Sequence, residues 1–264
     1  MEPLVHMLKN RIIPKFLLRD GRLVKYRQFF DDKRMAGNPV STAKVYNDYG
    51  ADEFIVLDIV PSDESKAQVR DMVKTMSEEI FMPFTVGGGV TTLDDVYELL
   101  RAGADKVSVN SHAVREPSFV GDAARRFGDQ CITVSIDFKD ISPGVPRVFI
   151  NGGREKTQHN PIDWALKMQD ALCGEILITS IDRDGMMTGY DTDMIAKLNE
   201  QLDVPLVVSG GCGGLQHCID AFANGASAVA ISSLFLFTDH SPIKLRSHLV
   251  SNGINVRASK TSRN

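Results

Sequence analysis

The two halves of the chain repeat one another at a constant spacing. Residues 53–59 match 175–181, residues 83–89 match 205–211, and residues 103–111 match 225–233, an offset of 122 residues each time. Neither half would close a sheet alone, although the whole chain is long enough for a sizeable core. The repeat therefore predicts a single domain, residues 1–264, made of two fused halves at about 7–126 and 127–252.

Eight apolar segments rich in Val and Ile alternate with eight amphipathic segments. The apolar segments are nearly continuous in hydrophobic character, which is typical of strands buried on both faces. An open, doubly wound sheet uses the same alternation, but eight strand–helix units in about 250 residues match a (β/α)8 barrel. The predicted fold class is therefore α/β, a (β/α)8 TIM barrel built from two half-barrel repeats.

The predicted strands cover residues 12–18, 53–59, 83–86, 106–109, 131–137, 175–180, 205–208 and 228–231. The predicted helices cover residues 42–49, 66–79, 93–102, 118–127, 162–172, 193–201, 215–223 and 242–250. Two segments fit neither pattern: residues 140–160 are predicted to be an insertion after the fifth strand, and residues 26–37 a long mobile loop after the first. Both would lie at the mouth, the end of the barrel where the strands finish and where barrel chemistry is found.

Charge and cysteine content exclude several classes of protein. Thirty Lys and Arg residues against 34 Asp and Glu residues give a net charge of −4, which is not the basic footprint of a nucleic-acid-binding protein. No apolar run reaches the length of about 18 residues that a membrane span needs. The four cysteines lack C-x-x-C spacing, so we expect reduced core residues in a cytoplasmic protein with no metal site and no cofactor. They are Cys131, Cys173, Cys212 and Cys218.

Two glycine clusters end the third and seventh predicted strands, and Ser or Asn follows the next strand in each case. Small residues at a barrel mouth let backbone N–H groups approach an anion, and the following helix adds its dipole. Turn formation alone would use glycine equally well, but two clusters in one register favour two phosphate sites for a small molecule phosphorylated at both ends. The candidate phosphate-binding residues are Gly88, Gly89, Asn110, Ser209, Gly210, Gly211, Ser232 and Ser233.

Carboxylates also end strands, at Asp58, at Asp137 and in the turn that holds Asp182 and Asp184. A carboxylate there faces the mouth and can act as a general acid or base. Loop capping is the alternative. It is favoured for Asp182, whereas for Asp58 capping and catalysis are evenly balanced. Asp137 is the best candidate acid because no turn residue adjoins it, while its counterpart in the first half, near Leu17, is apolar.

Four charged residues begin strands at the opposite, basal end of the predicted barrel. Two cations and two anions there could close a ring of ion pairs, which we call the basal ring. A layer that only stabilises the barrel is the alternative, because stability is the usual role of that end. The basal ring consists of Arg11, Glu53, Lys106 and Glu175.

Several motifs resemble the cyclase subunit of imidazole glycerol phosphate synthase, in order and over about residues 7–257. They lie at residues 11–14, 20–25, 84–89, 104–110, 178–185, 189–191 and 208–211. The resemblance implies a (β/α)8 barrel that docks a glutaminase of the class I amidotransferase type on its basal end. Ammonia passes up the barrel in that family and reacts at the mouth with a bisphosphorylated ribulosyl-imidazole substrate, in histidine biosynthesis.

The resemblance also implies roles for individual residues. The family's gate at the ammonia entrance falls on the basal ring, and its interface aspartate on Asp105. Its mobile-loop lysine falls on Lys25, its second catalytic aspartate on Asp137, and a further mouth aspartate on Asp184. Its phosphate sites fall on the two glycine clusters, Asn110 and the serines at 209 and 233.

One position departs from the family's pattern. The first catalytic aspartate is replaced by Leu17, and leucine cannot transfer a proton. Lys15 points to the same side of the strand and is a candidate surrogate base if burial lowers its pKa. The loop after the first strand has one extra residue, and a family histidine after the last strand is Leu236. The departures gather at the mouth, while the basal ring is intact.

This contrast gives the leading hypothesis: a paralogue, of the type found in surface-polysaccharide gene clusters, that conducts ammonia but has impaired cyclase chemistry. A glutaminase would supply ammonia, and a sugar amidotransferase making acetamidino sugars of lipopolysaccharide would use it. One alternative is a working cyclase of histidine biosynthesis that relies on Asp137 and a surrogate base. The other is a barrel that binds a phosphorylated ligand without ammonia transfer.

Overall fold

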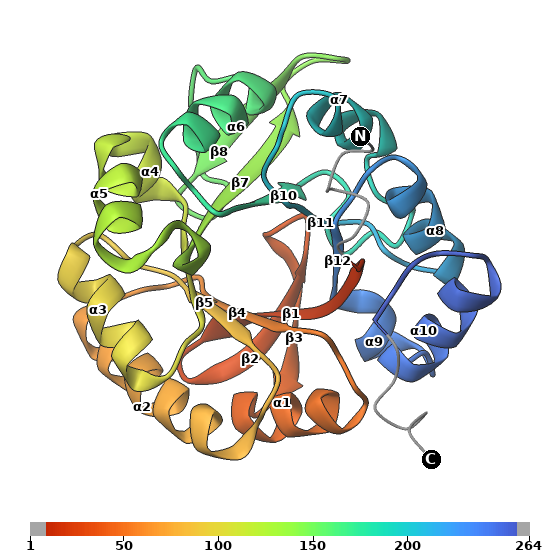
Figure 1. Cartoon of the computed structure of the whole chain (residues 1–264), viewed down its shortest axis with the longest axis horizontal. Helices are drawn as coiled ribbons and strands as arrows, with labels where there is room; N and C mark the ends of the chain where they lie inside the picture. Colours follow the sequence, from red (N-terminus) through yellow and green to blue (C-terminus); the bar gives the residue numbers. More distant parts are fainter. Residues whose placement is uncertain (1–8, 258–264) are drawn as a thin grey trace, which may run out of the picture.

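The computed structural model describes residues 9–257, which form a closed parallel barrel surrounded by helices (Figure 1). Eight strands pair in the order β10-β11-β12-β1-β4-β5-β6-β7, and β10 pairs with β7 to close the sheet. The barrel strands are β1 (Arg11–Arg19), β4 (Phe54–Asp58), β5 (Phe84–Gly87), β6 (Lys106–Val109), β7 (Ile132–Asp140), β10 (Glu175–Ser180), β11 (Leu206–Ser209) and β12 (Ala228–Ile231). The predicted (β/α)8 barrel is confirmed, and an open sheet is excluded by the β10–β7 pairing.

Helices follow the strands and cover the outside of the barrel (Figure 1). Side-chain caps start several of them: Ser62 and Thr92 form capping boxes, and Asn38 and Asn160 each precede a proline in the first turn. The larger helices are α1 (Pro39–Asp48), α2 (Asp63–Glu79), α3 (Leu93–Ala102), α5 (Ser118–Phe127), α6 (Pro161–Asp170), α7 (Thr192–Asn199), α8 (Leu215–Ala223) and α10 (Pro242–Ser251). Short helices α4 (Ser111–Arg115) and α9 (Ser233–Phe237) follow β6 and β12, and a 3-10 turn at Asp129–Cys131 precedes β7.

Two separate groups of buried side chains stabilise the barrel. The larger group lies between strands and helices and includes Phe16, Phe54 and Trp164. The smaller group fills the barrel axis from alternate positions of the strands, as expected when successive side chains point to opposite faces. Its members are Ile13, Ile55, Leu177, Val207, Ala228 and Ala230.

Two hairpins extend from the mouth. Strands β2 (Arg22–Arg27) and β3 (Asp31–Gly37) form the first, and β2 pairs with the end of β1. The prediction of a loop at residues 26–37 was therefore wrong, because positive φ at Gln28 and Phe29 allows a tight turn that pairs the two strands. The predicted insertion at 140–160 contains β8 (Pro146–Ile150) and β9 (Glu155–Lys156), which extend the β7 edge.

The two predicted halves contribute equally to the barrel. Residues 7–126 contain β1, β4, β5 and β6, and residues 127–252 contain β7, β10, β11 and β12. Within residues 9–257, no helix is both long and apolar enough to cross a membrane.

Candidate functional site

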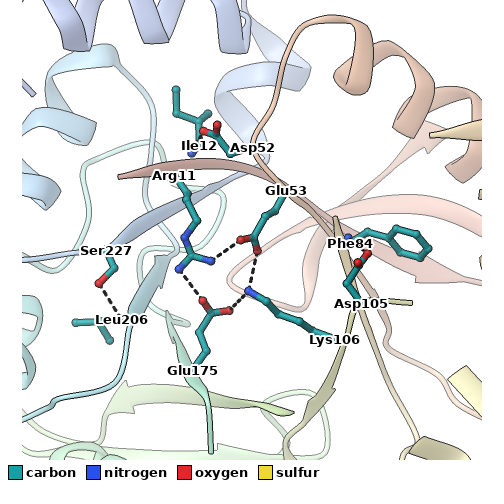
Figure 2. Close-up of polar contacts among 10 residues, drawn as sticks. All are labelled: Arg11, Ile12, Asp52, Glu53, Phe84, Asp105, Lys106, Glu175, Leu206 and Ser227. Atoms are coloured by element: carbon teal, nitrogen blue, oxygen red, sulfur yellow. Dashed lines mark hydrogen bonds and ion pairs between the residues drawn. The ribbon is translucent and has the colours of Figure 1, made fainter. Parts of the chain in front are cut away.

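The basal ring is closed at the end of the barrel where the strands begin (Figure 2). Arg11 donates to Glu53 Oε1 at 2.5 Å and to Glu175 Oε1 at 2.6 Å. Lys106 Nζ donates to the second oxygen of each carboxylate, at 3.0 Å for Glu53 and 3.1 Å for Glu175. Each of the four residues thus contacts two others, and the ring joins strands β1 and β6 to the residues that begin β4 and β10.

The ring side chains are largely shielded from water, and the pKa shifts of Arg11 and Glu53 favour their charged forms. Their exposed fractions run from 6% for Glu175 to 20% for Arg11. Burial lowers the pKa of Arg11, but the charges of Glu175 and Glu53 outweigh it and raise that pKa above its ordinary value. Burial likewise raises the pKa of Glu53, whereas Arg11 and Lys106 bring it below its ordinary value. Two cations and two anions give the ring no net charge.

Around the ring, the basal face repeats one backbone contact in both halves (Figure 2). Asp105 is exposed, and its carboxylate accepts a hydrogen bond from the backbone N–H of Phe84 at 2.9 Å. The hydroxyl of Ser227 accepts one from the N–H of Leu206 at 3.2 Å. Leu206 lies 122 residues after Phe84, and Ser227 lies 122 residues after Asp105, so the two contacts are equivalent in the two halves. Asp105 therefore has a structural contact besides the partner contact predicted for it.

Above the ring, Lys15 places an amine inside the barrel. It is 7% exposed, and its Nζ donates to Thr179 Oγ1 at 3.1 Å and to Ser209 Oγ at 2.9 Å. Burial lowers the pKa of Lys15, and the charges of Asp184 and Asp137 only partly oppose that effect. The sequence predicted the direction in which Lys15 points, but not its two hydroxyl partners, which come from β10 and β11.

The mouth above Lys15 contains two polar pairs. Lys25, on β2, donates to both carboxylate oxygens of Asp184, at 2.8 and 2.9 Å, and both residues are buried. Asn110 Nδ2 donates to Asp137 Oδ2 at 2.7 Å. Desolvation by burial raises the pKa of Asp137 to about 6, although Lys15 and the Asn110 hydrogen bond lower it. Asp137 can therefore bind or release a proton near neutral pH.

Leu17 occupies the position in the first half that Asp137 occupies in the second. Leu17 pairs with Leu57 across β1 and β4, and Asp137 pairs with Thr179 across β7 and β10. Because residues 57 and 179 are 122 apart, the sheet register makes Leu17 and Asp137 equivalent. Leu17 lines the mouth, so the first half presents an apolar side chain where the second presents an acid.

A hollow of about 420 Å³, part of it open to solvent, lies at the mouth, where the second predicted phosphate loop meets Lys15, Lys25 and Asp184. Phe29, from the turn of the first hairpin, also lines it, a residue for which the sequence offered no signal. The lining residues include Lys15, Leu17, Lys25, Phe29, Asp184, Ser209, Gly210, Gly211, Cys212, Ser232 and Ser233.

The first predicted phosphate loop lies against a different hollow. Gly88 and Gly89 line a second pocket, with Lys66 and Asp95. Those two side chains form an ion pair at 2.9 Å, so the lysine is already partnered by a carboxylate. Of the two clusters, only the second therefore lines one pocket with Lys15 and Asp184.

Both glycine clusters also serve close backbone packing. A Cβ on Gly88 would lie 2.2 Å from the carbonyl oxygen of Asp58, and one on Gly210 would lie 2.5 Å from that of Ser180. Both glycines have positive φ, at 110° and 90°. Since 88 and 210, like 58 and 180, are 122 residues apart, the turn-forming role weighed from the sequence is met in both halves. This packing role does not prevent the same turns from binding phosphate.

The other two strand-end carboxylates, Asp58 and Asp182, accept hydrogen bonds from neighbouring groups, which is the alternative role considered for them above. Asp58 accepts from the backbone N–H of Val60 at 3.0 Å and from the hydroxyl of Ser65 at 2.8 Å, next to the cap of α2. Asp182 accepts from the N–H of Asp140 at 3.0 Å, which ties the turn to β7. Asp137 and Asp184 remain the carboxylates available to the mouth.

Comparisons with known proteins agree with this arrangement. A family model described as "Histidine biosynthesis protein" matches residues 11–241. The chain is 44% identical over 252 residues to imidazole glycerol phosphate synthase subunit HisF of Alkaliphilus metalliredigens (strain QYMF), and 44% identical over 252 residues to that of Hydrogenobaculum sp. (strain Y04AAS1). Each match covers 95% of this chain and 100% of the relative. The chain therefore belongs to the family of histidine-biosynthesis proteins that includes the HisF cyclase subunits.

Proposed function

We propose that this chain is the barrel subunit of a glutamine-dependent complex, in which it conducts ammonia from a glutaminase to its mouth and has impaired cyclase chemistry. One contrast carries the proposal: the basal ring is complete, whereas Leu17 stands where the equivalent position of the other half has Asp137. Loss of a positioned acid or base costs about 10²–10⁴ in rate. Changes that spare ammonia entry and remove proton transfer favour a conduit over a cyclase.

The interior above the ring supports passage of a small neutral molecule. The axial side chains from β12 are apolar and short: Ala228 pairs with Arg11 of the ring, and Ala230 reaches the mouth pocket. Hydroxyls follow toward the mouth, among them Thr179 and Ser209. Ammonia can exchange hydrogen bonds with such hydroxyls, while the apolar section disfavours ammonium.

The basal face supports docking of the glutaminase. Phe81 is 85% exposed and Leu172 is 50% exposed, and each lies in a loop that enters a barrel strand, on the same end as the ring. Aromatic and aliphatic side chains of this kind are enriched in the centres of protein interfaces. The two relatives are named as subunits of a synthase, and by resemblance the partner is a HisH-type glutaminase of the class I amidotransferases.

The ammonia acceptor proposed is a separate sugar amidotransferase that makes acetamidino sugars for lipopolysaccharide. This part rests on the resemblance to paralogues in surface-polysaccharide clusters and on the loss of the acid at Leu17. The phosphate loop at Gly210 and Gly211 then holds a phosphorylated small molecule without turning it over.

A working cyclase of histidine biosynthesis is the second candidate, and one observation favours it. Asp137 keeps a pKa of about 6, with Lys15 close enough to affect it, so the mouth retains a group able to transfer protons at neutral pH.

Turnover of the bisphosphorylated ribulosyl-imidazole substrate, with ammonium salts as the nitrogen source, separates the two candidates. We expect negligible turnover, while a co-purifying glutaminase hydrolyses glutamine only in the presence of this chain. Leu17→Asp should raise cyclase turnover, whereas Leu57→Asp, which puts a carboxylate at the same level on the neighbouring strand, should not. Robust turnover by the unmodified chain establishes the cyclase, and glutaminase activity independent of the chain rejects the conduit.

A further inference from the structure

The mouth pocket has a buried amine at its base. Lys15 is almost fully buried, and its Nζ contacts two neutral hydroxyls, Thr179 Oγ1 and Ser209 Oγ. Among residues 9–257, no carboxylate lies within ion-pair distance of it. No ion pair therefore offsets the cost of burying a charged amine at this position. Nearly all other buried lysines are paired with a carboxylate.

Lys25 and Leu17, which line the same pocket, show how the surroundings of Lys15 differ from those of a paired lysine. Lys25, in the same pocket, donates two short hydrogen bonds to the carboxylate of Asp184. On the strand of Lys15 itself, the next inward residue is Leu17, which offers no carboxylate. Burial lowers the pKa of Lys15, so a larger fraction of this amine is neutral and nucleophilic than for a lysine in water.

Features that fit a phosphate group adjoin the amine. Ser209, which accepts a hydrogen bond from Lys15, is followed directly by Gly210 and Gly211, and all three line the pocket. The hydroxyl of Ser232 in the same lining is buried and makes no hydrogen bond with any residue between 9 and 257. A buried hydroxyl donor without an acceptor is expected where a ligand oxygen completes its hydrogen bonding.

A proton carrier is also at hand. Asp137 is buried on the neighbouring side of the mouth, where its charge and that of Lys15 influence each other. The carboxyl is oriented by Asn110 and titrates near neutral pH. It can therefore supply a proton to a leaving hydroxyl and take one back afterwards.

We propose that Lys15 is a carbonyl-reactive lysine, which forms an imine with a short phosphorylated aldose or ketose whose phosphate binds at Ser209–Gly211 and Ser232. The amine nitrogen of Lys15 adds to the carbonyl carbon to give a carbinolamine. Its hydroxyl then leaves as water with a proton from Asp137, and the C=N bond of the protonated imine forms. This chemistry needs no oxidant, no glutaminase and no ammonia, so it stands or falls separately from the ammonia conduit.

Reductive trapping tests the proposal. The full chain is incubated with ribulose 5-phosphate and sodium cyanoborohydride, which reduces a protonated imine to a stable secondary amine, and adducts are assigned to individual lysines by mass spectrometry. Because burial lowers the pKa of Lys15, its neutral fraction exceeds that of a lysine in water, and we expect several-fold more adduct on Lys15 than on Lys25, which contacts Asp184. Ribulose without phosphate should label Lys15 far less.

Variants check the assignment. Lys15→Met should lose this adduct and keep the background on surface lysines. Leu17→Asp should also reduce labelling, because a carboxylate two residues along the strand holds the lysine as an ammonium. Adduct formation on Lys15 of the unmodified chain is informative even if neither variant folds. Absence of an adduct on Lys15 while other lysines are labelled overturns the proposal, and equal labelling by ribulose overturns the phosphate site.

Discussion

Removal of Arg11 from the basal ring is the sharpest test of its energetics. Arg11→Met deletes the contacts at 2.5 and 2.6 Å and leaves Glu53 and Glu175 with Lys106 alone. The two carboxylates are only 10% and 6% exposed. Deleting one member of a buried ion pair costs about 3–5 kcal/mol, because the other charge stays buried. We expect a cost of about 3 kcal/mol, since Lys106 still contacts both carboxylates.

Urea unfolding followed by tryptophan fluorescence measures this cost. Trp164 is the chain's one tryptophan and is 2% exposed, so its emission reports unfolding of the barrel. The matched control is Arg11→Met combined with Glu175→Gln, which restores neutrality. The double variant should be more stable than the sum of the single costs predicts, by about 1–3 kcal/mol.

The pH dependence of the same variant has a defined sign. In the intact ring Arg11 and Lys106 hold the pKa of Glu53 below its ordinary value against the effect of burial. That stabilisation is present above the unfolded pKa and is lost as the pH falls through the folded pKa. In Arg11→Met burial prevails and the pKa of Glu53 rises, so the gap in stability between the two proteins should narrow as the pH falls from about 7 toward 4. A cost below about 1 kcal/mol, or a gap that does not change with pH, would refute the reasoning.

Three further outcomes follow from individual contacts. Arg246→Met should lower the free energy of unfolding by about 3–5 kcal/mol in thermal or urea melts, because it leaves buried Asp52 without its 3.0 Å partner. Gly210→Ala should cost about 1–3 kcal/mol and weaken binding of inorganic phosphate in calorimetry, since its Cβ would meet a carbonyl oxygen at 2.5 Å. Carbon-13 NMR should find the pKa of Asp137 near 6, and Lys15→Met should raise it further, because the Lys15 charge lowers it.

Much of the barrel was predictable because local patterns and the global fold agree. Apolar segments such as residues 175–180 and 228–231 are strands with the predicted bounds, and the helices at Leu93–Ala102 and Leu215–Ala223 begin and end as predicted. The hairpin of β2 and β3 was not predictable in this way. Strand β3 is exposed and polar, so no hydrophobic period marks it. Strand β2 is buried but short, and it pairs with the adjoining end of β1.

The candidate site divides in the same way. The basal ring could be predicted because strand starts must converge at one end of a closed barrel, and four charges there have to pair. Which side chains meet at the mouth could not be predicted, because long lysines reach across strands. Lys25 contacts Asp184 from a hairpin predicted to be a loop, and Lys15 contacts hydroxyls of two other strands. Such contacts depend on the shear of the barrel, which a periodic pattern does not encode.

The equivalence of Leu17 and Asp137 limits what the mouth can do. Two facing acids could divide the roles of proton donor and acceptor, whereas Asp137 alone can fill one role at a time. Lys25 and Asp184 form an ion pair, so the titratable groups left in the pocket lining are Lys15 and the thiol of Cys212. Lys15 donates to two hydroxyls of the mouth, whereas the Sγ of Cys212 lies against Cys218 and Gly214, so Lys15 is the better placed nucleophile or second proton carrier. If Lys15 proves unreactive toward carbonyls and the chain does not cyclise its family's substrate, the mouth is left as an exit for ammonia.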